Sequence, residues 1–262
     1  MLIVVSPAKT LDYESRIKTR KSTQPQFVEE AGILVEKLKS LNPGQLSRLM
    51  HMSDALGKTN YERYQQWQPS FGPKNSRQAI FAFKGDVYLG LEAEQLSATD
   101  LDFAQDHLRI LSGLYGVLRP LDLMRPYRLE MGTAMKIGRK KSLYEYWGSR
   151  LTESINDDLR ALAAKKEEKV LINLASHEYF NSLQARDIDA NVISPVFKDW
   201  ASGKYRVLSF FAKKARGQMA AWIIKNRVKD PDKLQEFDIE GYKYSAEESS
   251  TEKPTFLRKQ KK

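Results

Sequence analysis

The sequence predicts a mixed α+β fold of the α/β class, with its strands and helices in a single compact domain. Two short apolar runs rich in β-branched residues, 2–5 and 170–174, have the pattern of buried strands. Several longer segments repeat apolar residues at helical spacing. No internal repeat or proline-rich linker divides the 262 residues, and no regular βαβ alternation indicates a common topology. We therefore expect one globular domain of unusual topology over residues 1–245, followed by a basic, disordered tail over 246–262.

The first half of the chain is expected to begin with a buried strand over residues 2–5, which ends at Ser6-Pro7. The loop 6–10 then lies at a strand end. Apolar residues at helical spacing and N-capping residues predict three helices in this half of the chain, and a segment with a Gly-Asp turn predicts a strand and a short following element. These are helices over 27–41, from Asn42-Pro43 and from Ser53, and a strand, a turn and a short element over 79–91.

The second half is expected to begin with a helix that Ser97 caps and that continues as far as Ser112-Gly113. Over residues 142–164, the helical spacing of apolar residues predicts one long amphipathic helix. A short hairpin is expected around Ala201-Ser202-Gly203, because extended apolar segments flank it. The other elements are strands over 170–174, 192–200 and 205–211, and a helix over 213–228.

The chain is strongly basic, and its charge is uneven. Forty-three Lys and Arg residues oppose thirty-three Asp and Glu residues, which gives a formal net charge of +10. Residues 198–229 hold nine basic residues and one acidic residue, Asp199. Such a concentration of positive charge attracts polyanions, so we expect a binding partner of that class.

Composition also excludes several kinds of chemistry. The sequence has no cysteine, which rules out disulfides, thiolate metal sites and a cysteine nucleophile. Its three histidines are isolated and form no paired metal-binding or catalytic motif. Four carboxylates would have to be brought together by the fold to hold a divalent metal: Asp86, Asp122, Glu130 and Glu178. Their spacing does not indicate this, so we predict no catalytic residue, no metal and no cofactor.

The hydropathy pattern gives no sign of a membrane protein. The first apolar run, residues 2–5, is too short for a signal peptide. No run reaches the ~18 residues of a membrane span. A cytoplasmic protein without a membrane partner is therefore expected.

Two basic segments are candidate phosphate sites. Lys9 lies between Ser6 and Thr10 at the predicted strand end, although the segment lacks the glycines of a nucleotide-binding P-loop. The second segment crowds cations into the first turn of the helix predicted from 213 onward, where backbone amides also favour an anion. Its basic residues are Lys213, Lys214 and Arg216. Gly217 beside them would allow a ligand to approach closely.

A third candidate is the turn over residues 111–117. Its Leu-Ser-Gly-Leu-Tyr-Gly-Val sequence has the glycine spacing of a helix-hairpin-helix turn, in which backbone amides face a DNA phosphate. Pro120, however, would interrupt a second helix that begins at this turn. The alternative is an ordinary glycine cap at the end of the preceding helix.

Six ordered motifs across nearly the whole chain carry a resemblance to a known family. They are Ser-Pro-Ala-Lys-Thr-Leu (6–11), Phe-Lys-Gly-Asp-Val-Tyr (83–88), Leu-Ser-Gly-Leu-Tyr-Gly-Val-Leu-Arg-Pro-Leu-Asp (111–122), Tyr-Arg-Leu-Glu-Met-Gly (127–132), Asn-Leu-Ala-Ser (173–176) and Phe-Ala-Lys-Lys-Ala-Arg-Gly (211–217). Together they resemble the bacterial peroxide stress protein YaaA family. The resemblance implies a cytoplasmic protein that is induced by hydrogen peroxide and limits iron-dependent (Fenton) damage to DNA. It also implies an unusual single-domain fold with a positive cleft and a helix-hairpin-helix-like element that binds double-stranded DNA.

The predicted function is therefore binding of double-stranded DNA with little sequence preference. The residues expected to contact DNA phosphates are Lys9, Ser112, Gly113, Leu114, Gly116, Arg119, Arg128, Lys213, Lys214 and Arg216. An alternative is an enzyme that acts on a nucleotide or nucleic acid, with Lys9, Asp86, Arg128 and Glu130 in the same cleft. Direct iron sequestration has less support, because only oxygen ligands would be plentiful. No protein partner is predicted.

Overall fold

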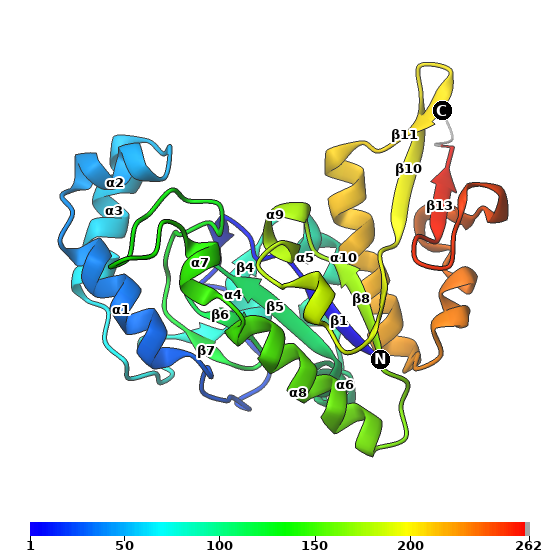
Figure 1. The fold of residues 1–262 in the computed structure, drawn as a ribbon, viewed down its shortest axis with the longest axis horizontal. Helices are drawn as coiled ribbons and strands as arrows, with labels where there is room; N and C mark the ends of the chain where they lie inside the picture. Colours follow the sequence, from blue (N-terminus) through cyan, green and yellow to red (C-terminus); the bar gives the residue numbers. More distant parts are fainter. Residues whose placement is uncertain (260–262) are drawn as a thin grey trace.

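A central five-stranded sheet organises the computed structural model, which describes residues 1–259 (Figure 1). Its strand order is β6-β5-β1-β8-β9. β1 pairs in parallel with both β5 and β8, β8 pairs in parallel with β9, and β6 is antiparallel to β5. The strands are β1 (Leu2–Val5), β5 (Leu108–Ser112), β6 (Gly116–Leu118), β8 (Val170–Leu174) and β9 (Asn191–Ile193). The strands predicted over 2–5 and 170–174 are confirmed.

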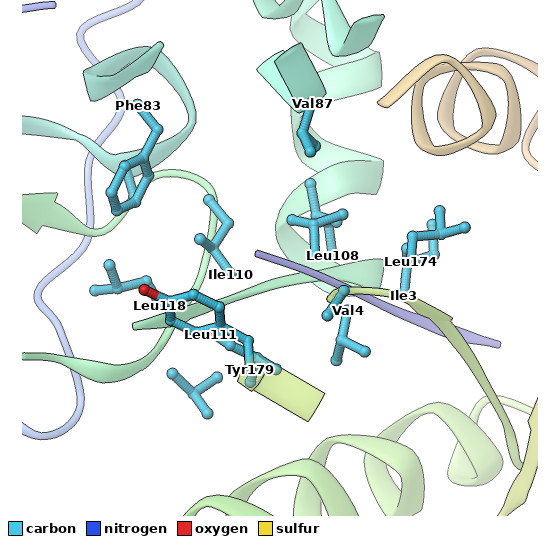
Figure 2. Close-up of a cluster of buried hydrophobic side chains, with 14 of the residues drawn as sticks. Ile3, Val4, Phe83, Val87, Leu108, Ile110, Leu111, Leu118, Leu174 and Tyr179 are labelled. Atoms are coloured by element: carbon cyan, nitrogen blue, oxygen red, sulfur yellow. The ribbon is translucent and has the colours of Figure 1, made fainter. Parts of the chain in front are cut away.

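The main hydrophobic core surrounds β1. All four residues of this strand are fully buried, as expected for a parallel strand that is covered on both faces. Ile3 and Val4 lie among side chains of the neighbouring strands, including Leu108 and Leu174 (Figure 2). Val87 comes into the same cluster from a helix above the sheet. The continuous apolar run at the start of the sequence therefore forms the centre of the domain.

Three helices lie together at one end of the molecule (Figure 1). They are α1 (Val28–Lys39), α2 (Pro43–Leu49) and α3 (Asp54–Gln65). Asn42 caps α2 in a capping box, in which the Gln45 amide donates to the Asn42 side chain at 2.9 Å and the Gln45 side chain accepts in return at 2.8 Å. Ser53 caps α3. All three predicted helices are confirmed.

Short elements connect these helices to the sheet and beyond. The segment 79–91 contains more helix than predicted, because its aromatic and aliphatic residues pack as two short helices around a two-residue strand. The remaining strands before residue 130 are β2 (Thr10–Leu11), β3 (Arg77–Gln78), β4 (Phe83–Lys84) and β7 (Leu123–Met124). The helices are α4 (Ala79–Ala82), α5 (Asp86–Leu91), α6 (Ala98–His107) and α9 (His177–Phe180), with 3-10 turns at Ala93–Gln95, Ala185–Asp187, Pro231–Glu236, Ile239–Gly241 and Ala246–Glu248.

The helix that Ser97 caps is shorter than predicted. α6 ends at His107, and the chain continues directly into β5. Leu108 and Leu111 fit the helical spacing, but pairing with β1 decides the conformation of this segment. Arg109 lies buried in the strand and is bonded to Asp158 at 2.6 and 2.7 Å.

The turn after β5 closes a β-hairpin, so the predicted helix-hairpin-helix element is wrong. β5 and β6 flank residues 113–115, and this segment is buried. Gly113 is required because a Cβ there would lie 2.2 Å from the Leu129 carbonyl oxygen. Gly116 has a φ of +68°, which favours glycine. Both glycines thus serve the packing of a tight turn.

The long helix predicted over 142–164 is two helices. α7 (Leu143–Trp147) and α8 (Arg150–Ala164) are separated at Gly148, whose φ is +55°. A positive φ stops a right-handed helix, and glycine adopts it without steric cost. The amphipathic pattern continues across Gly148, so the spacing of apolar residues does not predict the break between the two helices.

A second sheet, with strand order β11-β10-β13-β12, lies at the end of the molecule opposite α1 to α3 (Figure 1). Its strands are β10 (Val196–Ala201), β11 (Lys204–Arg206), β12 (Lys243–Tyr244) and β13 (Thr255–Arg258). The predicted hairpin around residues 201–203 is confirmed by the pairing of β10 with β11. The expected disordered tail is not observed over 246–259, because Phe256 is fully buried and β13 pairs with both β10 and β12. Residues 260–262 lie outside the described part of the chain.

Helix α10 (Ser209–Asn226) contacts strands of both sheets and crosses α5 at very short range. A Cβ on Gly217 would lie 1.8 Å from the Val87 carbonyl oxygen, and one on Gly90 would lie 2.1 Å from the Lys214 carbonyl oxygen. The two backbones therefore touch at paired glycines. Gly217 permits contact with a neighbouring helix and not with the ligand that the sequence suggested.

Stability should depend on pH through Glu167, a buried carboxylate. Burial by itself raises the pKa of Glu167, but hydrogen bonds from Lys229, His107 and the Met1 amino group outweigh it and lower the pKa from 4.5 to about 2. The ionised form is thus favoured by folding. Its contribution, about 3 kcal/mol, is complete above pH 4.5 and is lost as the pH falls toward 2.

Urea denaturation of the wild type and of Glu167→Gln between pH 7 and pH 2.5 checks this expectation. The difference in unfolding free energy between the two proteins should be largest at neutral pH and should shrink steadily below pH 4.5. A difference that stays constant over the whole range would contradict the assigned pKa.

Candidate functional site

A pocket opens where the strand order of the central sheet reverses. From β1 the chain moves to β5 and β6 on one side, and later returns to β8 and β9 on the other side. In open parallel sheets, ligands bind at such a switch point, outside the carboxyl ends of the strands. Residues 6–10, which follow β1, and Ser176, Glu178 and Tyr179, which follow β8, line a cavity of about 430 Å³ at this place. We call it the switch-point pocket.

Hydrogen bonds hold together the loops that line the switch-point pocket. The Ser176 amide donates to Ser6 Oγ at 2.8 Å, and the two hydroxyl groups lie 3.2 Å apart. The Tyr88 hydroxyl donates to the Ser6 carbonyl at 3.1 Å. These contacts tie the loops after β1 and β8 to each other and to α5. A site held in this way is positioned by rigid elements of the fold.

Charged side chains of both signs line the switch-point pocket. Glu130 accepts a hydrogen bond from the Arg128 Nε at 2.5 Å, and Lys9 Nζ lies 3.4 Å from the same carboxylate oxygen. Glu178 accepts a hydrogen bond from the Gly132 amide at 2.9 Å. The full set of charged lining residues is Lys9, Lys84, Arg128, Lys213 and Arg216 with Asp86, Glu130 and Glu178. The basic residues exceed the acidic ones by two (five and three).

Helix α10 contributes two cations to the pocket wall, Lys213 and Arg216. Neither side chain forms an ion pair or a hydrogen bond with any residue in 1–259. Burial lowers the pKa of the Arg216 guanidinium from its usual value, because its charge is removed from water without an acidic neighbour. Lys214, in contrast, bonds Glu240 at 2.5 Å and does not line the pocket.

Backbone amides of α10 do not contribute as the sequence predicted. The helix begins at Ser209, so Lys213 and Arg216 lie in its second turn and beyond. The amides at these positions donate within the helix and are not available to an anion. Any anion at this wall must therefore be bound by side chains.

The structure brings together four of the ten residues predicted to contact phosphate. Lys9, Arg128, Lys213 and Arg216 come from three separate segments of the chain and line the one pocket. Besides Lys214, Arg119 also lies elsewhere, in an ion pair with Asp122 at 3.1 Å. The remaining four belong to the buried hairpin turn, where they have no exposed surface to offer: Ser112, Gly113, Leu114 and Gly116.

The residues named for the enzymatic alternative also meet here. Lys9, Asp86, Arg128 and Glu130 all line the switch-point pocket. Within residues 1–259, no three His, Asp or Glu side chains are grouped closely enough to hold a metal ion. Asp122 lies outside the pocket, where the Thr23 hydroxyl donates to it at 2.6 Å.

Sequence reasoning missed part of the site that follows β8. Ser176 and Tyr179 were not among the candidate site residues, although Ser176 comes shortly after an apolar strand. The usable signal was that two predicted strands, 2–5 and 170–174, are each followed within two residues by a serine. Their carboxyl ends lie at one edge of the sheet, which is where ligands bind in such folds.

The fold and the site define an α/β protein with a charged pocket at a strand switch point. A sequence profile of the family described as peroxide stress protein YaaA matches residues 1–248. A UPF0246 protein of Teredinibacter turnerae is 53% identical over 260 residues, which is 99% of this chain and the whole of that relative. A UPF0246 protein of Polynucleobacter asymbioticus is 51% identical over 262 residues and the full length of both chains. The chain belongs to the peroxide stress protein YaaA family.

Among the described residues, no helix has the length and apolar character that crossing a membrane requires. The longest, α10, has 18 residues and carries several charged side chains.

Proposed function

We propose that this chain acts in the peroxide stress response by binding duplex DNA with little sequence preference, and that this binding limits iron-dependent damage to the DNA. The observation that carries the proposal is the convergence of Lys9, Arg128, Lys213 and Arg216 on one pocket. Each of these residues was a candidate phosphate ligand by sequence alone.

The charges of these residues support contacts to a phosphate backbone. Glu130 offsets part of the charge of Lys9 and Arg128, since both lie within 3.4 Å of it. Lys213 and Arg216 have no such partner among residues 1–259, so they are the strongest candidates. Cations of this kind release counterions when they neutralise phosphates, and that release favours binding to any sequence.

Affinity for a duplex should therefore fall steeply as salt is raised. We expect the double variant Lys213→Ala/Arg216→Ala to bind all duplex sequences more weakly. It should also reduce the slope of log K against log salt by about 1 for each phosphate that is no longer neutralised. Fluorescence anisotropy with two unrelated duplexes over a salt series measures both quantities.

Lys225→Ala is the matched control, because Lys225 is an exposed cation of the same helix and does not line the pocket. It should keep the wild-type slope and affinity. Equal reductions in affinity for the control and the double variant would mean that the interaction is diffuse, and a wild-type affinity independent of salt would refute phosphate binding altogether.

A further inference from the structure

The switch-point pocket has the size of a site for one small ligand. Its volume of about 430 Å³ lies within the ~300–1,000 Å³ that is typical of small-molecule pockets. Phosphate contacts to a duplex backbone require exposed cations but no cavity. Duplex binding therefore leaves the cavity itself unexplained.

The environment of Arg216 indicates that one end of the ligand carries an anionic group. Its guanidinium is partly removed from water and has no anionic partner in residues 1–259. A charge in this position is costly unless a counter-charge reaches it. Arginine binds phosphate through two parallel hydrogen bonds, and Lys213 lies one helical turn before it on the same wall. These two side chains form an anion site that the protein does not itself fill.

The other lining residues of the pocket indicate the chemical character of the rest of the ligand. Apolar and aromatic groups form much of its lining, from Pro7, Val87, Tyr127, Leu129 and Tyr179. Such groups bury a ring or another apolar body. The carboxylates of the lining accept hydrogen bonds but repel a second anion. The ligand should thus have one anionic end, an apolar ring and hydrogen-bond donors.

We propose that the switch-point pocket binds a single mononucleotide-sized phosphate ester, with Arg216 and Lys213 as the phosphate ligands. The apolar wall takes the base, and the carboxylates accept hydrogen bonds from the sugar hydroxyl and base amino groups. This inference goes beyond duplex binding and does not depend on it. The nucleotide has two sources with the same chemistry, the free nucleotide in solution and a nucleotide turned out of a bound duplex.

The first arm of the test is titration calorimetry with dAMP. The wild type should bind dAMP, and Arg216→Gln should bind it about tenfold or more weakly, because a charge-assisted hydrogen bond to the phosphate is removed. Lys225→Ala is again the control and should bind dAMP as the wild type does.

The second arm uses Ala8→Phe, which adds an apolar ring at a half-buried lining position without changing charge. It should abolish dAMP binding, because the added ring takes the space that the base needs. The nucleotide turned out of a duplex is detected with a duplex that carries 2-aminopurine at a central position. The fluorescence of 2-aminopurine rises when the base leaves the stack. Ala8→Phe should suppress that rise.

The results separate the two proposals. Binding of dAMP that both pocket variants weaken supports the free nucleotide, whether or not the protein binds a duplex. A fluorescence rise that Ala8→Phe suppresses supports the extruded nucleotide. Absence of both signals in the wild type, or dAMP binding that neither variant changes, overturns the inference, and duplex binding can still hold in either case.

Discussion

Phe256→Ala is expected to destabilise the protein by about 3–5 kcal/mol, which is a large part of the stability of an ordinary domain. Phe256 is fully buried in β13, the strand between β10 and β12. Its ring stacks on Phe197 at 5.5 Å and meets Phe237 edge-on at 5.6 Å. Truncation of this side chain leaves a cavity in the centre of a small aromatic core. Urea denaturation followed by circular dichroism measures the effect.

Leu257→Ala is the matched control, because the next residue of the strand has its side chain on the opposite face and is only half-buried. It should cost about 1 kcal/mol, in proportion to the smaller area that it removes from water. Similar small decreases in stability for both variants would mean that residues 255–258 are not held in the sheet.

The same segment illustrates where prediction from the sequence fails. Residues 246–262 are polar and rich in lysine, and their only large apolar residues, Phe256 and Leu257, form a very short run. The partners that bury this run, Phe197 and Phe237, come from other parts of the chain. A strand that is stabilised entirely by distant residues leaves little local signal. The strands over 2–5 and 170–174 were predictable because their own residues are mostly apolar and β-branched, which is typical of a buried strand.

The hairpin after β5 illustrates a different limit. The glycine spacing at 113 and 116 is compatible with a helix-hairpin-helix turn and equally with a tight β-turn. Parallel pairing of β5 with β1 decides between them, and that pairing joins residues about one hundred positions apart. A local motif therefore predicted the need for glycine correctly and the surrounding structure wrongly.

The candidate site was predictable residue by residue but not as a pocket. Lys9, Arg128, Lys213 and Arg216 were each singled out by charge or by the family motifs. Their convergence depends on the strand order β6-β5-β1-β8-β9 and on the position of α10 beside the sheet. Neither the strand order nor the position of α10 can be read from composition or spacing.

The position of α10 itself rests on the glycine contact with α5, and Gly217→Ala should disrupt it. The new Cβ would lie 1.8 Å from the Val87 carbonyl oxygen and 2.8 Å from the Leu91 amide nitrogen. Backbone atoms cannot rotate away, so the two helices must separate. We expect a net destabilisation of about 2 kcal/mol or more, even though alanine is intrinsically favoured over glycine in a helix by ~1 kcal/mol.

Gly32→Ala in α1 provides a control of opposite sign. Its added Cβ would meet only the Trp67 ring, at an ordinary 3.8 Å, so the helix preference of alanine should stabilise the protein by up to ~1 kcal/mol. Thermal unfolding of both variants under identical conditions tests the contrast. Because α10 carries Lys213 and Arg216 to the pocket, Gly217→Ala should also weaken dAMP and duplex binding, whereas Gly32→Ala should leave both unchanged. A Gly217→Ala protein as stable as the wild type would show that the helices do not meet at these glycines.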